Sequence, residues 1–317
     1  MSLLKRCAIT ALGALVAFIG VAGGWIAWQL MRDPLAALPH EPAGLRIVSE
    51  ERHAPADSAG AREHRRLVLV STGGETIRIT VNLPAPAPAR PLPVLILLGG
   101  LRTGQNNVKY VSKPGDNVII GYEYPIAKKI RFGPAIIWEA PALRSAVLQV
   151  PGQVAAVIRW TRAQPWADPA RVSVLGISLG ALYLPAVHRL ARDHDLPLGP
   201  AIMAYGGADI AALLSNRLDI GPRWLRDLLA ASAAVLLRPV EPALHLPGLR
   251  GEFLLIIGAD DSLIPETSVR LMQELTPQPK TVIRLEGGHI RGGKTELAKT
   301  IVAISRGWLL ERRAINP

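Results

Sequence analysis

The feature that most constrains the fold is a series of short apolar runs, each of which ends in glycines or a polar loop. Strands that carry apolar residues on both faces are typical of a parallel sheet covered by helices. Segments with helical spacing, such as residues 154–160, lie between these runs. The alternation predicts an α/β fold with a mostly parallel central sheet flanked by helices. The runs in chain order are "VLILLGG", "DNVIIGYEYP", "RVSVLG", "GPAIMAYGG", "GEFLLIIGADD" and "KTVIRLEGGH".

Two further patterns complete the predicted sheet and its cover. Residues 64–84 contain two β-rich runs around Gly73 and Gly74, which predicts an antiparallel hairpin. The segment "LGALYLPAVHRLARDH" predicts a helix that Pro185 kinks or restarts, and Pro151 is expected near the start of the helix before it. A closing helix is predicted from "KTELAKTIVAISRGWLLERR".

The amino-terminal segment predicts an uncleaved membrane anchor. Two basic residues precede an uncharged run at 7–30, and Arg32 closes it. At about 1.5 Å per residue such a helix spans a hydrocarbon core of roughly 30 Å. Trp25 and Trp28 lie near its far end, where interfacial aromatic residues belong. A cleaved signal peptide is the main alternative and a buried helix of a globular domain a weaker one, but the run is long and lacks a small-residue cleavage site.

The charge of the amino-terminal segment favours one location. Lys5 and Arg6 before the apolar run favour an amino terminus in the cytoplasm, although Arg32 after the run weakens that bias. We therefore expect a single-pass signal anchor in the inner (cytoplasmic) membrane, with the body on the periplasmic or extracytoplasmic side. The chain has a formal net charge of +11, but the charges are dispersed and no nucleic-acid motif accompanies them, so we expect no nucleic-acid partner. The sequence leaves the oligomeric state open.

Two predicted parts follow the anchor at residues 1–32, and the second of them carries an insertion. Residues 33–61 are rich in proline, alanine and charge, and predict a linker. Residues 62–313 form the α/β domain. Within it, residues 208–250 interrupt the strand and helix pattern with helical runs. We expect this insertion to be a cap over a pocket; surface cover or membrane contact are the alternatives.

Ser178 lies in a setting that favours a nucleophile. It is the centre of "GISLG", with a strand pattern before it and a helix pattern after it. On such a turn the serine projects at the carboxyl edge of the sheet, and the glycines let strand and helix approach closely. The alternative is an ordinary serine in a chance glycine-rich turn, which the flanking context makes less credible.

A serine nucleophile needs a base and an acid that orients the base. In the fold where a G-x-S-x-G turn carries the nucleophile, these residues follow one another along the chain in the order serine, acid, histidine. His289 follows the last predicted strand in "LEGGH" and is the predicted base. Asp260 and Asp261 follow a buried strand in "LLIIGADDSLIP", and Asp209 follows the strand before it. Asp261 is the preferred acid, and Asp260 and then Asp209 stay open as alternatives. The remaining histidines are less suited by position: His40, His53, His64, His188, His194 and His245.

The oxyanion of an acyl-transfer reaction needs two N–H donors. One is expected from Leu179, which follows the serine at the start of a helix. The other is expected from the loop after "VLILLGG", from Leu101 or else Gly100. Arg102 follows and either meets a carboxylate-bearing substrate or is simply solvated.

With these segments in this order, the chain resembles the α/β-hydrolase superfamily, especially its dienelactone-hydrolase-like and prolyl-oligopeptidase-like serine esterases. The resemblance covers about residues 62–313 and rests on "VLILLGG", "VIRWTRAQPWADPARVSVLGISLGA", "LLIIGADDSLIP" and "LEGGH". Gly99 and Gly100 stand where that family often has His-Gly. The segment after them is short, so the usual first helix is expected to be reduced.

The resemblance implies hydrolysis of an ester, thioester or amide through an acyl-enzyme, with no metal and no organic cofactor. We expect a membrane-anchored carboxylesterase that acts on a small ester or acyl substrate. A peptidase, thioesterase or acyltransferase with the same triad is the alternative. From a different class, a non-catalytic membrane-tethered binding module with the same fold stays open.

Overall fold

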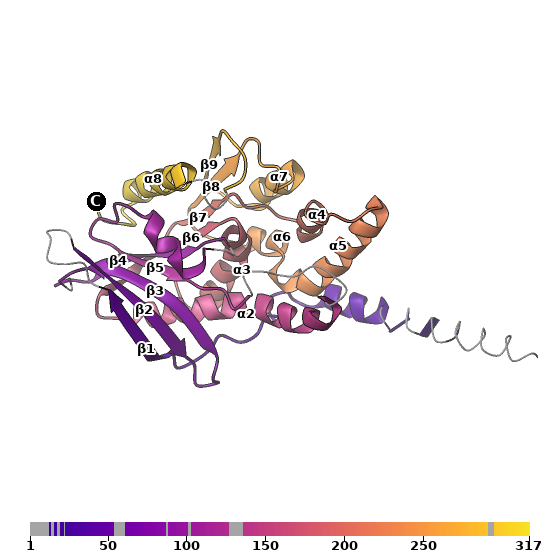
Figure 1. The fold of residues 1–317 in the computed structure, drawn as a ribbon, viewed down its shortest axis with the longest axis horizontal. Coiled ribbons are helices and arrows are strands. Elements are labelled where there is room, and N and C mark those ends of the chain that lie inside the picture. Colours follow the sequence, from indigo (N-terminus) through magenta and orange to yellow (C-terminus); the bar gives the residue numbers. More distant parts are fainter. Residues whose placement is uncertain are drawn as a thin grey trace, which may run out of the picture.

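A single nine-stranded sheet with helices on both faces forms the body of the protein (Figure 1). The computed structural model describes residues 13, 16–17, 20–21, 23–53, 61–86, 88–100, 103–126, 136–290 and 295–317. The strands are β1 Arg46–His53, β2 Arg62–Val70, β3 Thr76–Pro84, β4 Leu92–Leu98, β5 Val118–Tyr122, β6 Ala167–Ile177, β7 Ala201–Ala204, β8 Phe253–Gly258 and β9 Lys280–Leu285. The helices are η1 Gly104–Tyr110, α2 Ile136–Arg162, α3 Leu179–Asp193, α4 Ile210–Ser215, α5 Arg223–Leu237, η2 Arg238–Val240, α6 Pro242–His245, η3 Leu246–Gly248, α7 Glu266–Leu275 and α8 Thr295–Glu311.

The sheet is mostly parallel, as the apolar runs predict. Its strand order is β1-β2-β3-β5-β4-β6-β7-β8-β9. Neighbouring strands are parallel along the stretch β5-β4-β6-β7-β8-β9. They are antiparallel along the stretch β1-β2-β3-β5, so β5 pairs in both ways. The predicted hairpin is confirmed, since β2 and β3 pair from Val70 and Thr76 at the turn to Arg62 and Pro84 at the open end. Parallel order brings the carboxyl ends of β4, β6, β7, β8 and β9 to one edge.

The central strands are buried because helices cover both of their faces. Every residue of β4, β5 and β8 is buried. One face packs against α2, α3 and α7 in a core that includes Val157, Leu184 and Met272. The other packs against η1 and α8 around residues such as Val108 and Ile301. The short 3-10 helix η1 stands where the sequence predicts a reduced first helix.

The predicted linker at 33–61 holds more structure than the sequence indicated. Its residues Arg46–His53 form β1, which adds an antiparallel strand to the edge of the sheet. All of the residues of β1 are exposed, so the strand lacks the apolar alternation from which a strand is predicted. Earlier in the same segment, Glu41 binds Arg159 at 2.7 Å and His194 at 2.5 Å, and thereby fixes the chain to the body.

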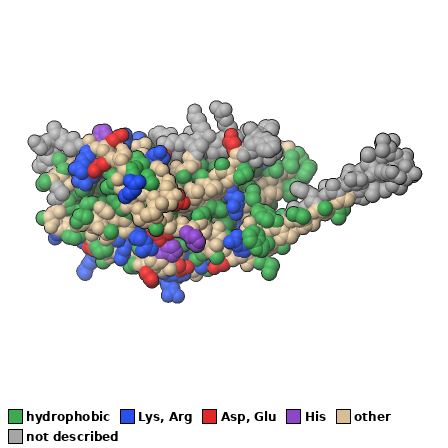
Figure 2. Space-filling model, turned by 90° about the horizontal axis from the view of Figure 1, so that it is seen from below, with side chains coloured by type: hydrophobic (Ala, Val, Ile, Leu, Met, Phe, Trp, Pro, Cys, Tyr) green, Lys and Arg blue, Asp and Glu red, His purple; other side chains and the backbone are tan. Residues whose placement is uncertain are grey.

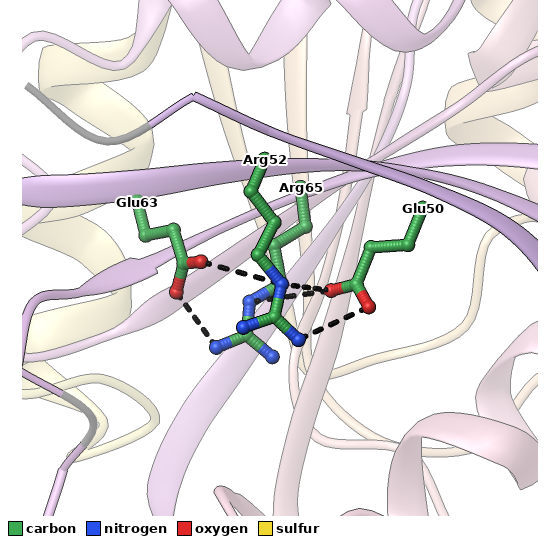
Figure 3. A network of polar contacts seen from close by, with 4 residues as sticks. All are labelled: Glu50, Arg52, Glu63 and Arg65. Atoms are coloured by element: carbon green, nitrogen blue, oxygen red, sulfur yellow. Dashed lines mark hydrogen bonds and ion pairs between the residues drawn. The ribbon is translucent and has the colours of Figure 1, made fainter.

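Charged side chains cover this exposed edge of the sheet. Arg52 of β1 contacts Glu50 at 2.9 Å, and Arg65 of β2 contacts Glu63 at 2.7 Å. Longer contacts of 3.8 Å cross between the strands, from Arg52 to Glu63 and from Arg65 to Glu50 (Figure 3). Exposed ion pairs add little stability, but charge on an edge strand discourages pairing with another chain.

Two helices run through prolines that the sequence analysis placed near a helix start, for Pro151, or at a kink or restart, for Pro185. Helix α2 begins at Ile136, so Pro151 lies inside it and not near its start. Helix α3 continues through Pro185. Each proline removes one backbone hydrogen bond, and packing outweighs that loss because both prolines are buried. Packing around Pro151 is close: a Cβ on the adjacent Gly152 would lie 3.2 Å from the carbonyl oxygen of His40.

The predicted anchor lies partly outside the described residues, which exclude 1–12, 14, 15, 18, 19 and 22. Among the residues that are described, no helix has the length and apolar character needed to cross a membrane. The helical residues 23–31 project from one end of the body (Figure 1). Their exposed apolar side chains include Trp28 and Met31, and Figure 2 shows hydrophobic side chains near the base of the projecting segment. Arg238 Nη1 donates to the carbonyl of Arg32 at 2.8 Å and ties the base of this segment to the body.

The insertion at 208–250 forms α4, α5, α6 and two short 3-10 turns. Its second half packs on α3, where Arg189 and Arg192 donate to the carbonyls of Leu244 and Gly248. Its first half borders the loop after β8, because Asn216 Nδ2 donates to the carbonyl of Ser262 at 2.9 Å. The role of the insertion as a cap stays a prediction.

Candidate active site

Ser178 occupies a strained turn between β6 and α3. Its φ of 55° lies in the left-handed region, which is unfavourable for a residue with a side chain. The two glycines of "GISLG" are required by close packing. A Cβ on Gly176 would lie 2.5 Å from the carbonyl oxygen of Gly180, and a Cβ on Gly180 would lie 1.9 Å from that of Leu98. The turn therefore presents Ser178 at the carboxyl edge of the sheet, as predicted.

The structure brings Ser178, His289 and Asp261 together from three separate loops. Ser178 Oγ lies 2.8 Å from His289 Nε2, and His289 Nδ1 lies 2.7 Å from Asp261 Oδ2. A carboxylate can only accept, so the imidazole proton sits on Nδ1. Nε2 is then left with a lone pair that accepts the hydroxyl proton of Ser178, which is the arrangement a general base requires.

The geometry distinguishes among the acids that the sequence left open. Asp261 Oδ1 accepts the backbone N–H groups of Leu263 at 2.9 Å and Ile264 at 3.2 Å, which turns Oδ2 toward His289. The preceding Asp260 is exposed. Asp209 instead caps α4, where its Oδ1 accepts the N–H of Ala212 at 3.1 Å.

His289 is held in a buried position. Gly287, two residues before it, has a φ of 95°, a conformation that glycine adopts at little cost, and the chain turns there after β9. The side chain of His289 is only 6% exposed. Tyr205 stands edge-on to the imidazole with ring centroids 5.8 Å apart. Burial, and then the negative charge of Asp261, raise the pKa of the Tyr205 phenol. The sequence analysis did not identify Tyr205, whose only signal was an aromatic residue at the end of an apolar run.

The other histidines of the core have structural partners. His188 is buried against the ring of Phe253, and burial lowers its pKa to about 4. His245 bonds the carbonyl of Pro239 at 2.8 Å, and burial likewise lowers its pKa to about 4. His194 follows the carboxyl end of α3, at the opposite end of this helix from Ser178, and binds Glu41. None of these contacts involves Ser178.

One predicted oxyanion donor lies at the start of a helix, and the other is not described. Leu179 is the first residue of α3, so its N–H has no acceptor within the helix. Leu101 and Arg102 lie outside the residues that the structure describes. The alternative donor Gly100 is described, and no acceptor within the described chain takes its N–H. The preceding carbonyl, of Gly99, accepts the hydroxyl of Tyr124 at 2.7 Å.

A surface hollow of about 480 Å³ lies between α4, α5 and the start of α7. Its lining is mixed and includes Asp209, Asn216, Arg223 and Pro265. None of the three side chains Ser178, Asp261 and His289 lines it. Over the described residues, no group of three or more His, Cys, Asp or Glu side chains is arranged to hold a metal ion.

Comparison with known proteins identifies the fold. No family model and no curated protein sequence matches the chain. Among solved structures, an acetyl xylan esterase from a Paenibacillus species superposes with a TM-score of 0.60 at 17% identity, over 83% of this chain and 89% of that one. An acetyl xylan esterase from a Thermoanaerobacterium species gives a TM-score of 0.58 at 15% identity, over 85% and 90%. An S-formylglutathione hydrolase from Agrobacterium tumefaciens gives 0.54 at 18% identity, over 84% and 99%.

These likenesses agree with the mostly parallel sheet covered by helices and with the fold that the sequence motifs indicated. The chain therefore has the fold of the α/β-hydrolase superfamily.

Proposed function

We propose that the protein is a serine hydrolase that cleaves carboxylic esters through a triad of Ser178, His289 and Asp261. The observation that carries this proposal is the continuous pair of hydrogen bonds from Ser178 Oγ through the imidazole of His289 to Asp261. Two proteins of similar fold are named acetyl xylan esterases, which supports an ester as the substrate class.

In the first half of the reaction, Ser178 Oγ attacks the carbonyl carbon of the ester. The hydroxyl proton passes to His289 Nε2, and the negative charge of Asp261 stabilises the imidazolium. The carbonyl oxygen becomes an oxyanion that accepts N–H groups from Leu179 and from the loop after β4. As this intermediate collapses, the bond to the alcohol oxygen breaks and the alcohol takes the proton from Nε2.

In the second half, water attacks the acyl group on Ser178. His289 Nε2 accepts a proton from the water and then returns a proton to Ser178 Oγ as the acyl–serine bond breaks. The products are a carboxylic acid and the free serine. The buried position of His289 favours this sequence, because electrostatic interactions act more strongly where water is excluded.

Labelling with a fluorophosphonate tests the triad directly. The wild type is expected to be labelled, and Ser178→Ala to lose the label while it keeps the wild-type melting temperature. The matched control is Ser262→Ala, since Ser262 is an exposed serine beside the loop of the acid. A folded wild type that the probe does not label would refute the nucleophile and favour the binding module.

A substrate panel separates the hydrolase classes. It should contain p-nitrophenyl esters of increasing acyl length, an acyl thioester and peptide anilides. We expect the highest kcat/KM on an ester. Preferred cleavage of an anilide would indicate a peptidase, and preferred cleavage of the thioester a thioesterase. Transfer of the acyl group to an added alcohol in preference to water would indicate an acyltransferase.

We further propose that residues 1–32 anchor the enzyme in the inner membrane, with residues 62–313 on the extracytoplasmic side. The uncharged run at 7–30 and the basic residues before it support this proposal. Extraction of membranes with alkaline carbonate should leave the full-length chain in the pellet. Release of uncleaved protein into the supernatant would contradict the anchor, and a shorter chain in the supernatant would indicate a cleaved signal peptide.

A further inference from the structure

The carbonyl of Gly99, directly after β4, accepts a hydrogen bond from a buried hydroxyl. Tyr124, just past the end of β5, is only 4% exposed, and its hydroxyl donates to the carbonyl of Gly99 at 2.7 Å. Burial raises the pKa of this phenol well above its usual value, so the group remains a donor over the whole pH range in which the enzyme could work. The phenol therefore keeps the proton that it donates to Gly99.

This bond determines which way the Gly100 N–H points. The carbonyl of Gly99 and the N–H of Gly100 belong to the same planar trans peptide, so they point in opposite directions. Fixing the carbonyl against Tyr124 fixes the N–H on the other side. Glycine would otherwise leave this peptide free to rotate, because it allows a wider range of backbone angles than any other residue.

A second contact extends the same support to the helix of the nucleophile. The ring of Tyr124 packs against the ring of Tyr183, with centroids 5.8 Å apart. Tyr183 is buried in α3, the helix that begins directly after Ser178 and supplies the Leu179 N–H. Tyr124 thus contacts both elements from which oxyanion donors are expected.

Glu123, the residue before Tyr124, forms a hydrogen bond with the backbone at the start of η1. Glu123 Oε2 accepts the backbone N–H of Gln105 at 2.9 Å. Between Gly99 and Gln105, the carbonyl of Gly100 accepts two hydrogen bonds from Thr103, one from its N–H at 3.0 Å and one from its hydroxyl at 2.9 Å. Two adjacent side chains after β5, Glu123 and Tyr124, therefore form hydrogen bonds with the backbone of Gln105 and of Gly99.

We propose that Tyr124 is a positioning residue for the oxyanion hole, which holds the Gly99–Gly100 peptide in register with the first turn of α3. The proposal rests on the proposed hydrolase function. Among the described residues, the hydrogen-bond and ring partners of Tyr124 include Gly99 and Tyr183 but neither Ser178 nor His289, so Tyr124 acts through the backbone donors. Its removal should therefore weaken binding of the transition state and leave binding of the ground-state ester largely intact.

The test is Tyr124→Phe, with Tyr122→Phe as the matched control. Tyr122 is also buried and packs edge-on against Tyr124 at 5.4 Å. Its hydroxyl donates at 2.7 Å as well, but to Gln153 Oε1 on α2 and not to the oxyanion loop. Each variant deletes one buried hydroxyl from the same aromatic cluster, so a merely structural role predicts equal effects. The measurements are kcat and KM on a p-nitrophenyl ester, the rate of fluorophosphonate labelling, and the melting temperature.

We expect Tyr124→Phe to lower kcat by about 10- to 100-fold, somewhat less than the roughly 100- to 1,000-fold that outright loss of an oxyanion donor costs. KM should change by less than about twofold, and the labelling rate should fall in step with kcat because the phosphonyl oxygen occupies the same site. Tyr122→Phe should keep kcat within about twofold of the wild type, with a similar fall in melting temperature.

Equal kcat values for the two variants would overturn the proposal, as would a change confined to KM in Tyr124→Phe. A kcat loss without slower labelling would also overturn it. Failure of the proposed function is a separate outcome, since it requires that the wild type itself be inert to esters and to the fluorophosphonate.

Discussion

Replacing Asp261 by asparagine tests the assignment of the acid with little change in shape. The two oxygens of Asp261 have different partners. Oδ1 accepts the N–H groups of Leu263 and Ile264, and Oδ2 faces His289 Nδ1. In an asparagine, the amide oxygen must stay with the two backbone donors, because an NH2 group there would face other donors. The NH2 group then points at His289.

The magnitude follows from the tautomer of His289. An NH2 group beside Nδ1 requires that nitrogen to accept, so the imidazole proton moves to Nε2 and points at Ser178 Oγ. The base is then blocked. The same substitution in serine proteases of a different fold lowers kcat about 10⁴-fold. We expect Asp261→Asn to lower kcat to a similar degree, which corresponds to about 5 kcal/mol of activation free energy.

Asp260→Asn is the matched control. It makes the same chemical change one residue earlier, on an exposed side chain. We expect its kcat on a p-nitrophenyl ester to stay within about threefold of the wild type. Melting temperatures confirm that both variants are folded. The reasoning is refuted if folded Asp261→Asn retains more than about a tenth of the wild-type kcat, or if Asp260→Asn is the more damaging change.

Two further predictions concern stability. Gly180→Ala would place a Cβ 1.9 Å from the carbonyl oxygen of Leu98, so it should lower the free energy of unfolding by more than about 3 kcal/mol. In Gly307→Ala, on α8, the new Cβ meets nothing within 4 Å, so this change should be neutral or stabilising by up to about 1 kcal/mol. Thermal unfolding checks both variants, and equal melting temperatures would contradict the packing argument. His188 has a pKa of about 4 in the folded protein, so the unfolded chain takes up a proton first as pH falls below about 6.5. Its contribution should lower the free energy of unfolding by about 2 kcal/mol between pH 7 and pH 5, and His188→Asn should remove that part of the pH dependence in urea titrations.

The sequence determined the fold class because the relevant signals are local. A strand buried on both faces must be apolar throughout, and this property marks β4, β5 and β8 in the sequence. Close packing behind Ser178 excludes any Cβ, and this requirement appears as the glycines of the turn. Ser178, the acid and His289 each follow a predicted strand, which indicated that their side chains meet at one edge of one sheet.

Elements without a local signal could not be predicted. Strand β1 is exposed along its whole length, so only its hydrogen bonds to β2 reveal it. Helix α2 continues through Pro151 because burial against α3 and the sheet compensates for the lost hydrogen bond. In both cases the stabilising partner is distant in the sequence.

The details of the site depended on the tertiary structure for the same reason. Asp260 and Asp261 are adjacent and chemically identical, so the sequence favoured Asp261 but left Asp260 open, and the direction in which the loop turns the two side chains brings Asp261 to His289. Tyr124 was one aromatic residue among several after a buried strand until its hydroxyl was seen to bond Gly99. Composition and spacing specify which chemical groups reach the edge of the sheet, whereas orientation depends on contacts between segments far apart in the chain, and those contacts exist only in the folded protein.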